Sequence, residues 1–301
     1  MSDYNPAPKT AEMLNYALEK IEELPYEVSA RYAFYRIIQG FEGYKKGDYK
    51  KFLQLTAKAR KSFWNGWAPD TLVDDTREIA NEYGTGFTNP LKWYEAQAKK
   101  SPKLEIAEHF DELPIAMFEA KAMIRQFKHY LDPYRVPLCG FGGDPSIPYK
   151  WEIAKFIDEL EEKWPDKTIH VLYFGDLDTK GEEIPEWAIR DIRRWSSADF
   201  EFTRVGINEE HVDEFGIEES PNEPGKYQWE ALDDQAAKKL IIGAVSEFFD
   251  ASTVNALKRV EKRCGEIWGE QVQAAIKAAK QTIGEEELDF PDSDEDETEE
   301  D

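Results

Sequence analysis

Residues 171–184 read VLYFGDLDTKGEEI, an apolar run typical of a buried strand that ends in two aspartates one residue apart. Asp176 and Asp178 follow this run directly, beside Gly175. Carboxylates at positions i and i+2 beyond a strand end can turn toward one hard cation, and Mg²⁺ prefers oxygen ligands and needs few of them from protein. Acidic turns after strands are also common on protein surfaces, so the pair alone leaves a metal site and a solvated turn both open.

The composition indicates a globular protein, and any metal that it holds is expected to have oxygen ligands. The chain has 301 residues, 41% hydrophobic and 13% aromatic, enough for a sizeable core and two modest domains. No uninterrupted apolar run approaches bilayer length, so we expect a cytoplasmic protein with no membrane partner. Cys139 and Cys264 are the only cysteines, too few for a disulfide framework or a four-cysteine zinc site.

The charge is unevenly distributed along the chain. A net charge of −24 argues against simple nonspecific adhesion to nucleic acid. Residues 31–61 nevertheless contain nine basic and two acidic residues, a local net charge of +7. Residues 285–301 are the opposite, with twelve acids among seventeen residues. This composition predicts a disordered tail that either keeps the protein soluble or competes with phosphates for the basic region.

The order of expected elements predicts an α/β fold after a helical first domain. Apolar positions at helical spacing predict helices over 10–23, 26–40 and 47–64, and residues 66–110 resemble a connector. Strands are expected at 115–118, 135–139, 168–174 and 200–206, with helices at 120–131, 150–163 and 184–195. This alternation predicts a mainly parallel sheet with helices on both faces. Helical runs are expected at about 230–249 and 252–283.

Three acids are expected at one edge of this sheet. Glu119 follows the first strand, and Asp176 and Asp178 follow the third. Sites in parallel sheets lie at the carboxyl ends of strands. Glu119 can be a metal ligand, a general acid or base, or a carboxylate at a helix N-terminus. The glycine-rich turn 139–143 can either present backbone N–H groups to a phosphate or be an ordinary turn.

A strand ending in Glu119, within IAMFEAKAM, followed later by a strand ending in Asp176-Leu-Asp178, resembles the Toprim domain of topoisomerases, primases and related nucleases. Two further segments, Arg31-Tyr-Ala-Phe-Tyr35 and Asp74-Asp75-Thr-Arg77, resemble the winged-helix region of the topoisomerase VI A subunit and its meiotic double-strand-break relatives. The order of motifs is closest to small phage and mobile-element Toprim proteins. Trp229-Glu-Ala-Leu232 resembles an acidic-x-Ala-Leu motif in those relatives.

The resemblance spans roughly residues 30–250 and implies an N-terminal helix over 1–25, a basic winged-helix-like domain and connector over 26–110, and a Toprim-like domain over 111–250. A C-terminal helix over 251–284 and the disordered tail 285–301 complete the expected organisation. The resemblance implies Mg²⁺, or Mn²⁺, held by Glu119, Asp176 and Asp178.

The resemblance also implies a catalytic tyrosine and a DNA substrate. Tyr35 matches the tyrosine that attacks the phosphodiester and becomes linked to the 5′ phosphate, and Arg31 matches a group that holds the phosphate. It implies a homodimer in which the tyrosine of one subunit meets the acids of the other. Strand passage needs a separate ATPase or phage partner, since the chain has no P-loop. Expected DNA contacts are Arg36, Lys45, Lys46, Lys50, Lys51, Lys58, Arg60, Lys61, Arg77 and Lys180.

Alternatives remain at several of these residues. Tyr35 lies in an aromatic run of the kind that usually packs a core, which favours a hydrolytic nuclease with a metal-bound water. A third alternative is a non-catalytic DNA-binding or assembly subunit of a phage. Many relatives have Asp-x-Asp-Pro-Ser-Gly, whereas here Lys180 follows the aspartates and either contacts a phosphate or pairs with Asp178. Arg77 likewise holds a phosphate or pairs with Asp74 or Asp75.

Overall fold

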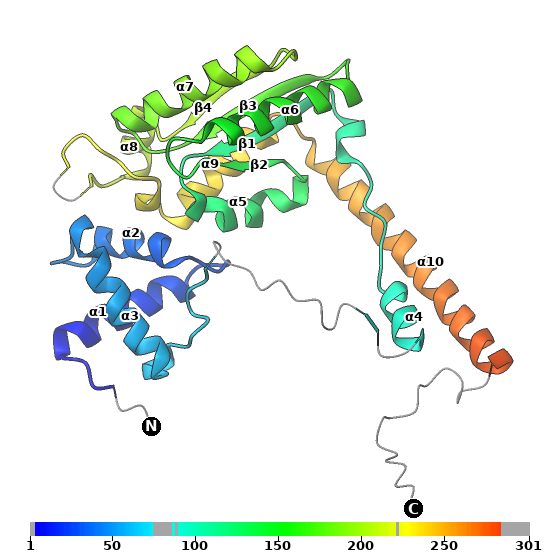
Figure 1. The fold of residues 1–301 in the computed structure, drawn as a ribbon, viewed down its shortest axis with the longest axis horizontal. Helices are drawn as coiled ribbons and strands as arrows, with labels where there is room; N and C mark the ends of the chain where they lie inside the picture. Colours follow the sequence, from blue (N-terminus) through cyan, green and yellow to red (C-terminus); the bar gives the residue numbers. More distant parts are fainter. Residues whose placement is uncertain (1–3, 75–85, 88–89, 221–222, 284–301) are drawn as a thin grey trace, which may run out of the picture. The chain divides into compact units, whose positions relative to one another are not determined.

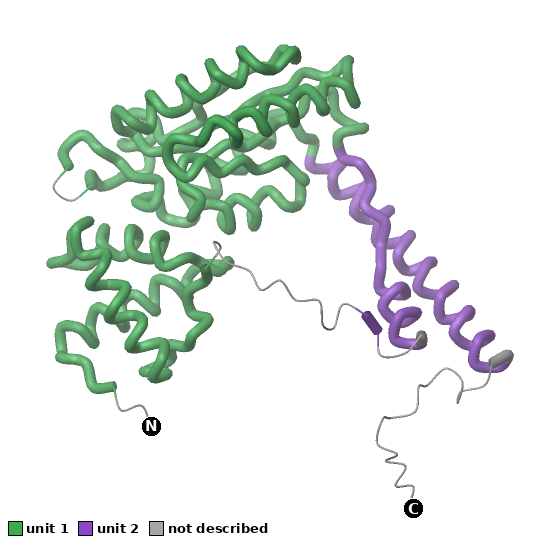
Figure 2. Tube along the Cα trace, viewed as in Figure 1, with its two compact units in different colours: residues 1–77, 107–250 green, residues 78–106, 251–301 purple. Residues whose placement is uncertain are grey.

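The chain forms two compact units in the computed structural model, which describes residues 4–74, 86–87, 90–220 and 223–283. One unit comprises residues 1–77 and 107–250, and the other comprises residues 78–106 and 251–301 (Figure 2). Residues 78–106 of the expected connector and the C-terminal helix thus belong to one unit. Arg77 and the acidic tail 285–301 lie outside the described residues.

The first unit begins with the three helices that the spacing of apolar residues predicts. They are α1 (Pro8–Glu22), α2 (Ala30–Gly40) and α3 (Tyr49–Lys61); the short 3₁₀ turn η1 (Lys46–Asp48) precedes α3, and η2 (Trp64–Gly66) follows it. Their apolar faces meet around the buried rings of Phe34, Phe52 and Trp67. Among the described residues 4–74, strand pairing is limited to one isolated bridge between Ser29 and Val73. The expected winged helix is therefore not confirmed.

A four-stranded sheet with helices around it forms the rest of the first unit and confirms the α/β expectation. The strands are β1 (Glu112–Phe118), β2 (Leu138–Gly140), β3 (Thr168–Phe174) and β4 (Glu201–Gly206). All neighbours are parallel, in the order β2-β1-β3-β4 (Figure 1). β3 coincides with the predicted strand, because its β-branched and aromatic residues fit a buried pleat.

Helices cover both faces of the sheet (Figure 1), which agrees with the burial of β1 and β3 at six of their seven positions. The helices are α5 (Ile124–Leu131), α6 (Ile147–Lys163), α7 (Thr179–Trp195), α8 (Glu209–Phe215) and α9 (Asp234–Ser246). Ile115 and Val171 belong to the core that includes residues of α6 and α7. The rings of Phe118 and Phe174 point to the other face, where both contact Phe127 of α5.

Helix α7 begins five residues earlier than the sequence analysis expects. The sequence predicts a helix from residue 184, but Asp178 Oδ1 accepts a hydrogen bond from Gly181 N at 2.8 Å and caps a helix that begins at Thr179. This side-chain cap supplies one of the acceptors that a helix N-terminus lacks. The helical run expected at 230–249 is instead the 3₁₀ turn η6 (Trp229–Ala231) followed by α9.

The second unit pairs α4 (Pro90–Ala98) with the long helix α10 (Ala251–Ile283). A Cβ atom on Gly269 would lie 2.9 Å from the carbonyl oxygen of Ala98, so glycine permits this close approach. Trp268 Nε1 donates to Gln97 O at 2.8 Å. Within the described ranges, no single helix is long and apolar enough to cross a membrane.

One buried hydrogen bond ties α5 to η6. Trp229 Nε1 donates to Gln126 Oε1 at 2.8 Å, and each residue is 1% exposed. We expect Gln126→Leu to lower the free energy of unfolding by about 1–3 kcal/mol, because it leaves the indole N–H buried without an acceptor. Lys128→Gln, on the exposed side of the same helix, is the control and should change it by less than about 0.5 kcal/mol. Urea unfolding measures both, and equal stabilities would contradict the role of this bond.

Candidate functional site

Glu119 leaves the sheet at the carboxyl end of β1, where a glycine turn holds its main chain. Gly142 N and Gly143 N both donate to Glu119 O, at 2.8 and 3.0 Å. Both glycines have positive φ, +72° and +93°, which other residues rarely adopt. The N–H groups of this turn are thus bonded to the protein, which supports the ordinary-turn interpretation of 139–143 over a phosphate cradle.

Asp176 and Asp178 lie beside Glu119, as the sequence predicts. Asp176 N donates to Glu119 Oε2 at 3.1 Å, and Asp176 Oδ1 accepts from Trp229 N at 2.8 Å. Between the two aspartates, Leu177 forms an antiparallel bridge with Tyr227. The segment before Trp229 is therefore held against the aspartate turn by main-chain hydrogen bonds.

Glu230 is the fourth carboxylate of this site, and we did not assign it from the sequence. It is 6% exposed and follows the anchored Trp229. Burial raises the pKa of Glu230, and the negative charge of Glu119 raises it further, while the cations Arg31 and Lys46 work against this shift. The available signal was the Trp-Glu-Ala-Leu motif at 229–232, which carries no indication of where its glutamate lies.

Mutual repulsion and burial dominate the electrostatics of the site. Burial raises the pKa of Asp176 well above its ordinary value, and the charges of Glu230 and Glu119 add to the shift. Burial also raises the pKa of Glu119, and the negative charge of Asp178 raises it further. The hydrogen bond from Asp176 N acts to lower this pKa but does not cancel the rise. Like charges held this close favour uptake of protons or a cation.

Arg204 and Lys226 supply positive charge around these acids. Arg204, on β4, donates from Nη2 to Asp176 O at 2.6 Å and from Nη1 to Ile207 O at 2.5 Å. Lys226 Nζ lies 3.8 Å from Asp178 Oδ2. Lys180, the predicted partner of Asp178 or of a phosphate, is exposed. Arg204 is a lone arginine in a strand, so its sequence context offered no signal for this role.

Tyr35 lies on α2 with two cations near its ring. Arg31 Cζ and Lys46 Nζ are 5.7 and 5.8 Å from the ring centroid. Tyr35 is half-buried, whereas its neighbours Tyr32 and Phe34 are fully buried and fill the core.

Lys46 connects this tyrosine with the acids of the same chain. Its Nζ donates to Glu223 Oε2 at 2.9 Å. Partial burial acts to lower the pKa of Lys46, but this hydrogen bond and the nearby charges of Glu223, Tyr35 and Asp176 raise it overall. The structure thus brings Tyr35, Lys46 and the carboxylates into one electrostatic neighbourhood within a single chain.

The predicted DNA-contacting residues divide into two groups. Arg36 Nη1 donates to Leu232 O at 2.6 Å, and Arg60 Nη1 donates to Leu72 O at 3.5 Å, so both support the main chain. The other predicted contacts of this domain are exposed: Lys45, Lys46, Lys50, Lys51, Lys58 and Lys61. At 100° per residue, four of them fall on one face of α3: Lys50, Lys51, Lys58 and Lys61.

The donor chemistry of the site fits Mg²⁺, since all four acids offer hard oxygen atoms. The buried hydroxyl of Tyr173 has no hydrogen-bond partner. A Cβ on Gly175 would lie 2.9 Å from both this hydroxyl and Glu119 Oε2, so glycine leaves the space between them open. In the described parts of the chain, no three acidic, histidine or cysteine side chains are arranged to hold a metal as they stand. Asp176 and Asp178 each accept a backbone N–H through Oδ1, so Oδ2 of each is the atom to offer a shared cation.

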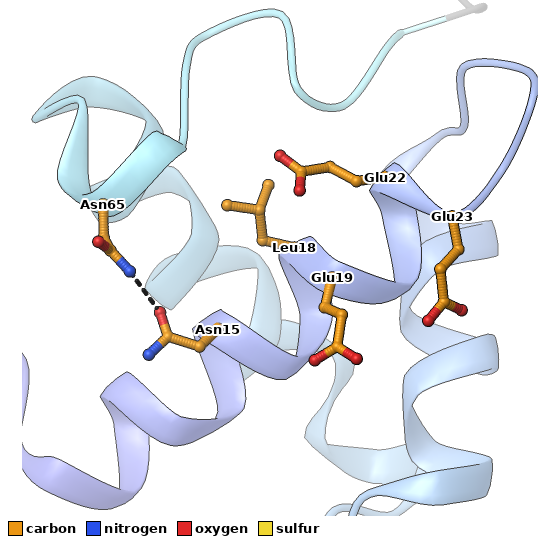
Figure 3. A pocket seen from close by; sticks show the side chains of 6 residues that line it. All are labelled: Asn15, Leu18, Glu19, Glu22, Glu23 and Asn65. Carbon is orange, nitrogen blue, oxygen red and sulfur yellow. Dashed lines mark hydrogen bonds between the residues drawn. The ribbon is translucent and has the colours of Figure 1, made fainter.

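A pocket of about 380 Å³ lies elsewhere, on α1 and η2 (Figure 3). Asn65 Nδ2 donates to Asn15 Oδ1 across it at 2.8 Å. Its remaining lining residues are Leu18, Glu19, Glu22 and Glu23. Because this lining has no basic or nucleophilic side chain and none of the site residues, we assign the pocket no role.

Comparisons of this chain with protein-family models, with curated proteins and with solved structures found no match. The functional argument therefore depends on the geometry of the carboxylates, the tyrosine and the lysine face.

Gly181 is the residue whose size most tightly constrains the site. A Cβ there would lie 2.2 Å from Asp176 O and 3.2 Å from Glu119 Oε2. We expect Gly181→Ala to lower the free energy of unfolding by about 1–3 kcal/mol, because the backbone of the aspartate turn must move. Gly243→Ala is the matched control: nothing lies within 4 Å of its Cβ position in α9. This control should raise the free energy of unfolding by up to about 1 kcal/mol. Thermal or urea unfolding measures both variants, and equal stabilities of the two would contradict the constraint at Gly181.

Proposed function

We propose that this protein cleaves DNA strands in a Mg²⁺-dependent reaction of the Toprim class, with Tyr35 as the nucleophile. The observation that carries the proposal is the gathering of Tyr35, Arg31 and Lys46 near four carboxylates at the carboxyl edge of a parallel sheet. Acids, a cation-flanked tyrosine and a basic helix face are the parts that transesterification of a phosphodiester needs.

The chemistry assigns each group a task. The Tyr35 hydroxyl gives its proton to solvent water and its oxygen attacks phosphorus; a tyrosyl O–P bond forms, and the P–O3′ bond breaks. Arg31 and Lys46 stabilise the phosphate charge. Glu119, whose pKa is raised, is suited to give a proton to the departing 3′ oxygen. Mg²⁺ bound by the carboxylates would polarise the phosphoryl oxygens and offset the repulsion among the acids.

A divalent cation should stabilise the folded protein through these acids. Binding at a hundredfold excess over Kd adds about 2.7 kcal/mol to the free energy of unfolding. We expect Asp176→Asn to retain or increase stability without metal, because it removes a repelling charge, and to lose most of the gain with Mn²⁺ or Mg²⁺. Asp166→Asn, an exposed acid near the other end of β3, is the control and should keep the gain. Thermal unfolding with and without metal measures this, and an equal gain in both variants would remove the metal assignment.

Tyr35→Phe separates chemistry from packing, since it keeps the ring and removes the attacking oxygen. We expect this variant to lose cleavage, and the unaltered protein trapped in denaturant to carry a 5′-phosphotyrosyl adduct on labelled DNA. Tyr134→Phe, whose ring stacks on Phe249, is the control and should cleave normally. Full activity of Tyr35→Phe without an adduct would instead support a hydrolytic nuclease with water as nucleophile.

DNA binding should depend on the lysine face of α3. We expect Lys50→Gln with Lys58→Gln to weaken binding to duplexes of any sequence and to reduce the slope of log K against log salt by about 2, because two phosphate contacts are lost. Lys128→Gln with Lys155→Gln removes the same charge from other helices and should leave the slope unchanged. Fluorescence anisotropy at several salt concentrations distinguishes the two, and equal slopes would exclude this face.

A non-catalytic DNA-binding or assembly subunit of a phage is the second candidate function. The observation that favours it is that Asp176 and Asp178 each accept a hydrogen bond from a backbone N–H. Both aspartates thus have a structural role that needs no metal. Retention of DNA binding with no cleavage under any metal or with any candidate ATPase would support this role over the catalytic one.

A further inference from the structure

Helix α10 has two apolar stripes, one buried and one exposed. Val254, Leu257, Val272 and Ile276 are buried, on the side of α10 where Ser101 and Leu104 hydrogen-bond to Glu261. A second set remains exposed: Val260 is 49% exposed, Ile267 is 45% exposed, and Cys264 between them is exposed.

The exposed set has the spacing of a coiled-coil seam. Val260, Cys264 and Ile267 are separated by four and three residues, which places them on one stripe of an α-helix. At 100° per residue this stripe lies about a third of a turn away from the buried one. Gln271 continues it by one position. The stripe is thus a separate surface, suited to another helix.

The charges beside this stripe favour pairing with a second copy of the same helix in the antiparallel direction. Arg263 and Glu270, seven residues apart, flank the same edge of the stripe. Arg263 forms an ion pair with Glu266 of its own helix at 3.0 Å, but its side chain is 66% exposed and available. In an antiparallel pair of these helices, Arg263 of each copy meets Glu270 of the other. In a parallel pair the same positions face Trp268 and Ala275, and no opposite charges meet.

We propose that a second copy of this chain packs antiparallel on this stripe, with Cys264 facing Ile267 of the second copy and Arg263 facing Glu270 of the second copy. Two equivalent ion pairs then flank a small apolar core, as a twofold interface requires. The proposal does not depend on the proposed function, because no residue of the carboxylate site takes part.

The first test measures association of the full chain by sedimentation velocity. The unaltered protein should be a dimer, and Ile267→Glu should weaken dimerisation at least tenfold, because it buries a charge in the seam. Gln273→Glu adds the same charge on a different exposed side of α10 and should leave the dimer intact. Circular dichroism confirms that both variants keep their helices. An unaltered protein that is monomeric at high concentration, or an Ile267→Glu dimer of full strength, overturns the proposal.

The second test decides the direction of the helices. Arg263→Glu and Glu270→Arg should each weaken the dimer several-fold, because like charges then meet at both pairs. Mixing the two variants in equal amounts should restore a dimer of one copy of each, in which every pair is again opposite in charge. A mixture that stays as weak as its parts overturns the antiparallel register. A short bismaleimide should also link two unaltered copies through Cys264, since Cys139 is buried.

Discussion

The pairing of β1 with β3 is the constraint on which the rest of the site depends. The two strands run parallel and in register over their whole length, so that Phe118 lies opposite Phe174. The residues that follow must leave the sheet side by side, and Glu119 N donates to Phe174 O at 3.0 Å to complete the register. Two acids distant in the sequence thereby reach the same edge. A shift by one residue would send these side chains to opposite faces.

Holding four acids together has an electrostatic cost that the surrounding structure offsets only in part. Backbone N–H groups and Arg204 supply hydrogen bonds, and Lys46 supplies charge, yet burial and mutual repulsion still raise the pKa of Glu119, Asp176 and Glu230. Buried charge without sufficient compensation is costly and is a common mark of functional sites. A bound cation would relieve this repulsion among the carboxylates. The clustering of acids that lowers the stability of the fold therefore also supports a metal-dependent function.

The helical domain contributes to the site through polar contacts with the sheet domain. Tyr26 donates to Asp234, which also accepts from Tyr130 of α5, and Arg36 donates to the carbonyl of Leu232. The Arg36 bond holds α2 near η6, and Tyr35 lies on the same helix. Such bonds also explain why some basic residues of this domain are committed to the fold, while the lysines on the outer face of α3 remain available for an anionic ligand.

Local patterns were sufficient for most of the fold. Apolar periodicity predicted α1, α3, α10 and the strand β3, and alternation of strands and helices predicted the parallel sheet, which in turn predicted that Glu119, Asp176 and Asp178 share an edge. The start of α7 was misplaced because its cap is an aspartate that we had assigned to a turn. Only the tertiary structure placed Glu230 and Arg204 with these acids, joined α4 to α10, and separated the structural arginines from the exposed lysines. The reason is physical: periodicity reports which face of an element is buried, whereas these placements depend on contacts between residues tens to hundreds of positions apart, which no local pattern encodes.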